Sequence, residues 1–263
     1  MSTGRDELFV RAGLTRPNWA LCSLEPVPVG SGSSVLAMIE IERLGDVAVV
    51  HLRDGENRFN GDSIASWHQA LDELDAVEGA LAVVTVGEGK FYSNGLDLEW
   101  MSANSDAAGP MIDDVHRLFG RVLGFRGITI AALNGHAFAG GAMLAAAHDF
   151  IVMRDDRGYW CLPEVDLGLP LTAAMHAVIT AKLPRVTAHE AMMTGRRYSA
   201  ADALEKGIVH RTAPESDVLN VAVVWATELA GKNRDVLAEH KRLTYRDAIA
   251  TCGVARGSTN RNQ

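Results

Sequence analysis

The clearest pattern near the start of the chain is a series of short β-branched runs. Residues 39–43 and 47–52 form two such runs on either side of Gly45-Asp46, which predicts two strands joined by a short turn. Residues 81–86 (LAVVTV) form a continuous apolar run, as expected of a strand that is covered on both faces. The first part of the chain is therefore expected to build a sheet.

Helical patterns lie between and after these runs. Residues 60–63 (NGDS) supply cap chemistry for an amphipathic helix to about Ala76, and a second helix is expected from about Met111 to Leu123. Alternating strands and helices with a helical end predict an α/β core and an α-helical C-terminal part. After Pro170 the expected helices cover residues 172–182, 187–194, 199–206, 215–231 and 234–250.

Two segments lack a sustained period. Residues 1–37 contain the Pro-, Gly- and Ser-rich stretch 25–34, which is typical of a flexible linker, so we predict an N-terminal extension without a function of its own. Residues 102–109 are expected to be mobile.

The stretch around which the chain is organised extends from Ile128 to Pro170. A β-branched run leads through Gly140-Gly141 into a small-residue helix, and an apolar strand at 150–153 precedes the carboxylate Glu164 in an apolar loop. Glycines at a helix start leave N–H groups open to a ligand oxygen, with the helix dipole behind them. An apolar loop raises the pKa of a glutamate towards that of a useful general base.

The composition is that of an ordinary soluble globular protein, with 48% hydrophobic and 22% charged residues among 263. A formal net charge of −8 argues against nucleic acid and anionic membranes as partners. No apolar run reaches the roughly 18 residues of a membrane span, and no secretory signal pattern is found. The widely spaced Cys22, Cys161 and Cys252 are expected to be reduced thiols of a cytoplasmic protein, with no metal site.

Three motifs resemble those of the crotonase family, also called the enoyl-CoA hydratase/isomerase superfamily. Residues 91–98 read FYSNGLDL, residues 134–142 read NGHAFAGGA, and residues 163–168 read PEVDLG. The resemblance implies an α/β fold of repeated ββα units that form a spiral over residues 38–195. A helical region at 196–263 would then help to build homotrimers, often paired into hexamers.

The resemblance also implies a substrate and an oxyanion hole. Family members act on acyl-CoA thioesters, so coenzyme A is part of the substrate and no separate cofactor is expected. By motif, the backbone N–H groups that bind the thioester oxygen belong to Leu96 and Gly140, and such donors stabilise the charge that forms there on deprotonation of the α-carbon. The residues expected to contact the substrate are Arg58 (towards the CoA phosphates), Asn94, Gly95, Trp100, Gly141 and Met143.

The carboxylates separate the activities within the family. Hydratases use two glutamates; the resemblance assigns the second to Glu164, but Met143 occupies the position of the first. Adding water requires one group to activate it and another to handle the α-proton, whereas one base suffices to move a double bond. A dry pocket lined by Met143 favours moving the double bond over adding water. The chain therefore resembles the Δ3-Δ2-enoyl-CoA isomerases of plant and peroxisomal type, with Glu164 carrying a proton from C2 to C4.

Two alternatives remain beside the isomerase. An enoyl-CoA hydratase of fatty-acid β-oxidation would need another carboxylate near Met143, for which Asp113 and Asp114 are the candidates. A non-catalytic acyl-CoA binder would keep full function after replacement of Glu164 by alanine.

Other polar residues receive secondary or structural roles. In an extended chain Asp166 would point the same way as Glu164, which makes it a second candidate base. Lys241 and Arg242 are first of all ordinary solvated cations, but they could also reach a phosphate bound to a neighbouring subunit. Structural roles are expected for Asp97, His136 and His148, and Ser93 is not expected to be a nucleophile, because it lacks a Gly-x-Ser-x-Gly setting.

Overall fold

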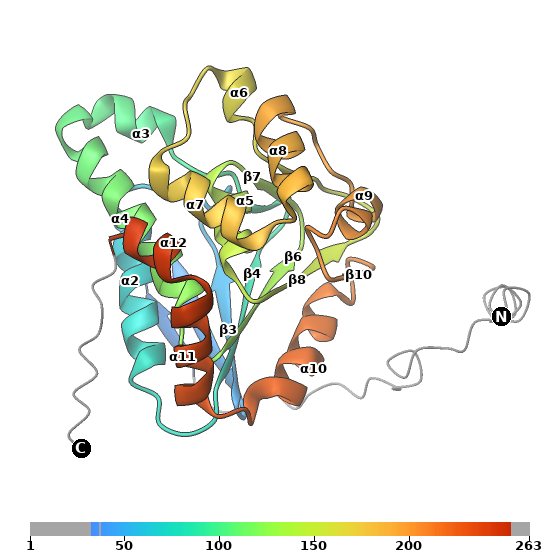
Figure 1. The fold of residues 1–263 in the computed structure, drawn as a ribbon. Coiled ribbons are helices and arrows are strands. Elements are labelled where there is room, and N and C mark those ends of the chain that lie inside the picture. Colours follow the sequence, from blue (N-terminus) through green and yellow to red (C-terminus); the bar gives the residue numbers. More distant parts are fainter. Residues whose placement is uncertain (1–32, 37, 254–263) are drawn as a thin grey trace, which may run out of the picture.

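The computed structural model, which describes residues 33–36 and 38–253, contains a large sheet and a small one (Figure 1). The large sheet has the strand order β1-β2-β3-β4-β6-β8-β10, and the small sheet has the order β5-β7-β9. The strands are β1 (Ser33–Leu36), β2 (Ile39–Leu44), β3 (Val47–Leu52), β4 (Ala82–Gly87), β5 (Phe91–Ser93), β6 (Ile128–Leu133), β7 (His136–Phe138), β8 (Phe150–Arg154), β9 (Trp160–Cys161) and β10 (Arg211–Ala213).

Helices cover both faces of the large sheet and extend beyond it. Their bounds are α2 (Gly61–Asp75), α3 (Leu98–Ala103), α4 (Ser105–Leu123), α5 (Gly140–Ala147), α6 (Glu164–Leu167), α7 (Ala173–Lys182), α8 (Arg185–Thr194), α9 (Ala200–Glu205), α10 (Val218–Ala230), α11 (Arg234–Thr244) and α12 (Arg246–Thr251). None of the helices described is long and apolar enough to cross a membrane.

The two faces of the sheet are built by the alternation of side chains along each strand. In β3, Val49 packs in the cluster beneath α10, whereas Ala48 and Val50 pack in the main core on the other face. In α10 an apolar stripe at four-residue spacing, which includes Ala222 and Ala226, lies against this sheet. The prediction that residues 81–86 form a strand covered on both faces is confirmed by β4, whose bounds differ by one residue.

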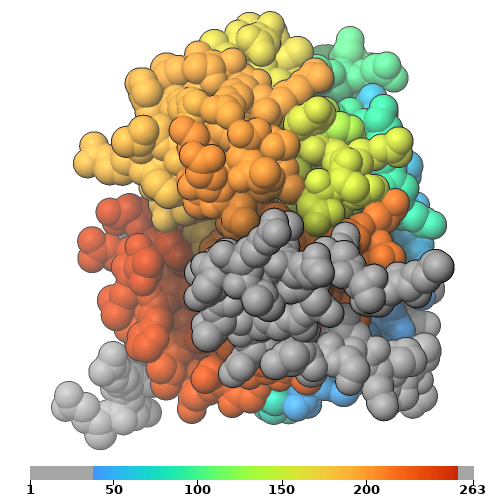
Figure 2. Space-filling view, turned by 90° about the vertical axis from the view of Figure 1, so that its right-hand side faces the viewer, coloured from blue at the N-terminus to red at the C-terminus, as the bar shows by residue number. Residues whose placement is uncertain are grey.

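Three successive turns of the chain follow the same path. The pairs β4/β5, β6/β7 and β8/β9 each place their first strand in the large sheet and their second in the small sheet, and a helix follows each pair. These turns form a spiral of ββα units, as the resemblance implies. The last third of the chain, orange and red in the space-filling view, forms much of one side of the molecule (Figure 2).

Two strands of the large sheet were not expected from the sequence, nor were β5, β7 and β9 of the small sheet. β1 lies within the segment assigned to the N-terminal extension and pairs antiparallel with β2. β10 lies between the helices expected at 199–206 and 215–231 and pairs parallel with β8. A run of three or four residues carries too little periodicity to be recognised, and each strand is defined by its distant partner. The rest of the proposed extension, with Cys22, falls outside the described residues.

Two helical predictions also require correction. The helix expected from about Met111 begins at Ser105, and residues 102–109 belong to α3 and α4, because Ala107, Ala108 and Asp106 in the first turn of α4 outweigh Gly109-Pro110; the mobility of this segment stays a prediction. The single helix expected at 234–250 is broken at Tyr245. The hydroxyl of Tyr245 accepts a hydrogen bond from the Lys182 ammonium (3.3 Å), which also lies over its ring.

Candidate active site

Three segments of the chain meet where the parallel strands of the small sheet end. β5 leads into residues 94–96, β7 into Ala139-Gly140, and β9 towards Glu164. Ligands of open α/β sheets bind at such carboxyl ends. The segments are in close contact, since the Ala139 N–H donates to the Cys161 carbonyl (3.1 Å). A Cβ on Gly95 would lie only 2.8 Å from the Gly140 nitrogen.

The backbone N–H of Leu96 has no acceptor among the described residues. Phe59 pairs with the residues on either side, donating to the Gly95 carbonyl (2.7 Å) and accepting from the Asp97 N–H (2.9 Å). This parallel bridge turns the Leu96 N–H away from Phe59. The Gly95 N–H, in contrast, donates to the Ser93 hydroxyl (3.2 Å). The Leu96 N–H is therefore available to a ligand oxygen.

The N–H of Gly140 is open for a different reason, because it is the first residue of α5. The first N–H groups of a helix have no acceptor within it, and the N-terminal residue Ala139 makes no side-chain cap. Ala139 has φ 50° and ψ −125°, a strained conformation for a residue with a Cβ. The ψ angle of Ala139 sets the direction of the Gly140 N–H. The strained conformation of Ala139 therefore fixes where this open donor points.

Glu164 begins the single helical turn α6 and has an open carboxylate oxygen. Burial raises the pKa of Glu164, as its apolar surroundings in the sequence predict. Its Oε2 is buried and, within the part of the chain that the structure describes, has no hydrogen-bond partner. A carboxylate with a raised pKa and a free oxygen is suited to act as a general base.

The two acids considered as a second carboxylate near Met143 are not buried. Met143 lies in α5 and is fully buried in the core. Of the two acids considered as partners, Asp113 exposes 73% of its side chain, and Asp114 forms an ion pair with Arg117. Both belong to α4 and neither is buried. Among the described residues, Glu164, which is half-buried and has a buried Oε2, thus remains the candidate base.

The sequence matches the enoyl-CoA hydratase/isomerase family model over residues 42–252. This chain belongs to that family. It is 34% identical to enoyl-CoA delta isomerase 3 of Arabidopsis thaliana, over 79% of this chain and 92% of that protein. It is 36% identical to a putative enoyl-CoA hydratase of Thermus thermophilus, over 73% and 78%. The family expected from the motifs, the crotonases that act on acyl-CoA thioesters, is confirmed, and the names of these relatives include both activities.

The fold of this crotonase is shared with solved structures. A probable enoyl-CoA hydratase of Mycobacterium tuberculosis has a TM-score of 0.77 at 24% identity, with 82% of this chain and 92% of that chain covered. The expected α/β spiral with C-terminal helices is confirmed.

Among the predicted substrate contacts of this crotonase, Arg58 and Asn94 share one protein partner. The Arg58 Nε donates to Glu56 Oε2 (2.8 Å), and the Asn94 side-chain amide donates to the same oxygen (2.8 Å). An acid two residues before Arg58 is visible in the sequence, but only the fold places it beside Asn94. Sequence reasoning therefore missed Glu56.

The other predicted contacts are positioned by packing. A Cβ on Gly141 would lie 2.3 Å from the Ser93 carbonyl oxygen, so this glycine lets α5 approach β5 closely. The Trp100 ring is half-buried and lies over Gly61, where a Cβ would be 3.1 Å from the ring. The contribution of these residues, and of Gly95 and Met143, to substrate binding stays a prediction.

Lys241 and Asp166 do not have the surroundings expected of them. Lys241 is buried, and its ammonium donates to Asp149 Oδ2 (2.6 Å) and to the Gly127 carbonyl (2.7 Å), so the prediction that it is a solvated cation is wrong, and its ammonium is not free for the alternative contact with a phosphate. Asp166 is exposed, and because α6 is helical it does not share the direction of Glu164. Arg242 is an exposed cation paired with Glu239 (2.6 Å).

His148 is structural, as expected. Its Nδ1 faces the Leu144 carbonyl (2.8 Å), which can only accept, so Nδ1 carries the proton. The Nε2 of the neutral ring then accepts from the Thr85 hydroxyl (3.0 Å), which accepts from the Tyr92 hydroxyl (2.8 Å). Burial lowers the pKa of His148 to about 4. This closed chain joins β4 and β5 to the end of α5.

Asp97 and Ser93 make internal contacts as well. Asp97 caps α3 by accepting from the Trp100 N–H (3.0 Å), and the Ser93 hydroxyl donates to the Asn57 carbonyl (2.7 Å). Cys161 and Cys252 are buried free thiols. In the described ranges, no group of three or more His, Cys, Asp or Glu side chains could hold a metal ion.

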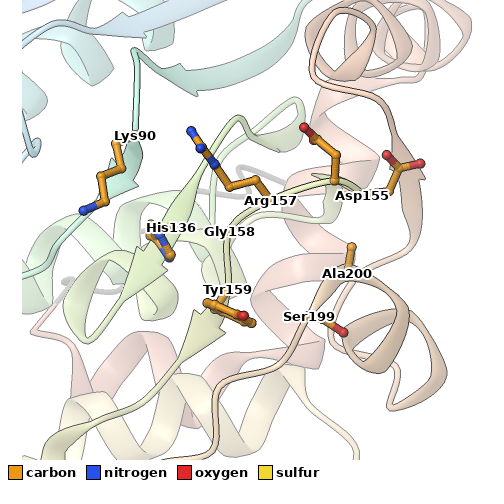
Figure 3. Close-up of a pocket in the computed structure, with 9 residues that line it drawn as sticks. Lys90, His136, Asp155, Arg157, Gly158, Tyr159, Ser199 and Ala200 are labelled. Atoms are coloured by element: carbon orange, nitrogen blue, oxygen red, sulfur yellow. The ribbon is translucent and has the colours of Figure 1, made fainter.

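A separate cavity of about 490 Å³ lies at the opposite end of the small sheet. Figure 3 shows Lys90, His136 and Arg157 towards one side of this cavity and Asp155 towards the other. Burial, and then the charges of Lys90 and nearby arginines, lower the pKa of His136, which favours a neutral ring. Its ring packs against Phe138 with the ring centroids 4.8 Å apart. The cavity contains none of the residues predicted for the active site.

Proposed function

We propose that this crotonase converts a 3-enoyl-CoA to the trans-2-enoyl-CoA through a thioester enolate. The observation that supports the proposal is the buried Oε2 of Glu164, which no described residue partners, at the strand ends that present the N–H groups of Leu96 and Gly140. Met143, buried in α5, stands where the resemblance places the second glutamate of a hydratase. One base and two oxyanion donors are sufficient for a double-bond shift.

In this proposal the thioester oxygen accepts hydrogen bonds from the N–H groups of Leu96 and Gly140. Glu164 removes a proton from C2, and the C–H electron pair forms a dienolate whose charge lies largely on that oxygen. The protonated Glu164 then delivers the proton to C4, the electrons close between C2 and C3, and the carboxylate is regenerated. The proton stays on the enzyme and substrate throughout, so no cofactor takes part.

The proposal includes assembly and location. We expect a cytoplasmic homotrimer or hexamer in which the C-terminal helices contact other subunits. Large apolar side chains on these helices are exposed in the single chain, among them Val236 (49%) and Leu243 (57%). Analytical ultracentrifugation of the purified protein tests this part, and a monomeric protein would contradict it.

The reaction is tested by incubating the protein separately with 3-hexenoyl-CoA and trans-2-hexenoyl-CoA while following the absorbance of the conjugated thioester. An isomerase produces signal from the 3-enoyl substrate and removes little from the 2-enoyl substrate. Loss of the 2-enoyl signal would instead indicate hydration. Silence with both, together with retained binding of acyl-CoA, would favour the non-catalytic binder.

A further inference from the structure

The loop that precedes α2 is hydrogen-bonded to residues 94–97, the loop after β5 that carries the Leu96 N–H and is called the oxyanion loop below. Both the backbone and the side chain of Asn94 make these hydrogen bonds. The Asn94 N–H donates to the Glu56 carbonyl (2.9 Å), and the Asn94 amide donates to the Glu56 carboxylate (2.8 Å). Arg58 contacts the same carboxylate oxygen, Oε2, through Nε (2.8 Å) and Nη2 (2.6 Å). These hydrogen bonds and the adjacent Arg58 charge lower the pKa of Glu56, so it is ionised at neutral pH.

The same arginine also faces the far side of the oxyanion loop. Arg58 Nη1 lies 4.0 Å from Asp97 Oδ1, the oxygen that caps α3. The Arg58 guanidinium thus contacts both sides of the Gly95-Leu96 peptide. Before the peptide it pairs with Glu56, which also binds Asn94, and after the peptide it faces Asp97. Between them, the Leu96 N–H is the donor left open.

We propose that Glu56 and Arg58 are positioning residues that fix the direction of the Leu96 N–H. Arg58 acts through its contacts with Glu56 and Asp97, called the brace below, rather than by binding a CoA phosphate. The inference rests on the proposed isomerase function. The Glu56 and Arg58 side chains are 41% and 35% exposed, so the ion pair adds little to the stability of the whole fold. Small errors in the placement of a catalytic donor nevertheless have large effects on rate.

The test compares Glu56→Ala, Glu56→Gln and Arg58→Ala on two substrates, 3-hexenoyl-CoA and 3-hexenoyl-pantetheine, which lacks the nucleotide phosphates. Glu56→Ala and Arg58→Ala should each lower kcat by about 10- to 100-fold on both substrates, with KM nearly unchanged. Glu56→Gln, which keeps an oxygen for the Asn94 amide, should recover part of kcat. The double variant should be little worse than either single variant, because both residues act on one loop.

Two controls separate this proposal from its alternatives. Asp235 lies on α11, and Asp235→Asn breaks its exposed ion pair with Arg126, so this change should leave kcat and the melting temperature unchanged. If Arg58→Ala raises KM for the CoA ester alone, Arg58 binds phosphate and the brace is overturned. Unchanged kcat in Glu56→Ala also overturns it. Failure of the wild-type protein to isomerise either substrate would instead overturn the proposed function.

Discussion

His148 and Glu164 are two titratable side chains whose pKa values are shifted by burial, yet their surroundings differ. Both ring nitrogens of His148 have partners, and the chain from Tyr92 to Leu144 has a donor and an acceptor at each step. Glu164 has a buried oxygen that has no hydrogen-bond partner among residues 38–253. A closed polar chain fixes a structure, whereas an open buried acceptor is ready to receive a proton from something else.

The two groups also act differently on stability. Burial lowers the pKa of His148, so the folded ring is neutral near pH 7 and carries no buried charge. Burial raises the pKa of Glu164, so its ionised form is less favourable in the folded chain than in the unfolded chain. The stabilisation associated with a raised pKa exists at low pH and is lost as the pH rises through the folded pKa. At neutral pH, Glu164 should therefore cost stability.

The largest effect expected from this comparison is that of Glu164→Gln. The change removes the proposed base and should lower kcat on 3-hexenoyl-CoA by about 10²- to 10⁴-fold. The free energy of unfolding in urea at pH 7 should be equal or higher, because a buried charge is lost. Asp166→Asn, an exposed carboxylate in the same turn, is the matched control and should keep wild-type activity. Equal activity of Glu164→Gln and wild type would remove Glu164 from the mechanism.

The next effect concerns the acid side of the stability curve. His148 has a folded pKa of about 4 against an ordinary value near 6.5, so the unfolded chain binds its proton first as the pH falls. Its contribution is complete above about pH 6.5 and is lost towards pH 4, by at most about 3 kcal/mol. Urea unfolding from pH 7.5 to 4.5 should show a flatter pH dependence in His148→Gln than in wild type. Parallel curves would show that His148 is not the group that titrates.

The parts of this molecule that sequence predicts best are those with local causes. β3 and the buried strand β4 follow from continuous β-branched runs, and α2 begins where Asn60 and Ser63 form a reciprocal cap. The family was recognised because the motifs around Gly95 and Gly140 are contiguous in sequence. Their place at neighbouring strand ends came from the family fold.

What the sequence did not predict depends on distant partners. Lys241 has the appearance of a solvated helix cation until Asp149 is placed beside it. Glu56 is an ordinary loop acid until β5 brings Asn94 to its carboxylate. Ala139 has no local preference for positive φ; the Cys161 carbonyl and the start of α5 hold it there. Contacts of this kind are set by tertiary packing and are absent from any short window of the chain.

The smallest effect, and the sharpest test of the closed chain, is that of Tyr92→Phe. The fully buried Tyr92 hydroxyl donates only to Thr85, and Thr85 can still donate to His148 after its loss. The free energy of unfolding should therefore fall by about 1 kcal/mol, the net value of one neutral hydrogen bond. Thr85→Val, which leaves both the Tyr92 hydroxyl and His148 Nε2 without partners, should lower the free energy of unfolding further in the same urea titration.

Both variants should keep the wild-type kcat, because this hydrogen-bonded chain contacts the end of α5 and is not expected to reach the substrate. A large fall in kcat in Tyr92→Phe at unchanged stability would place this chain in the catalytic machinery and erase the distinction from Glu164.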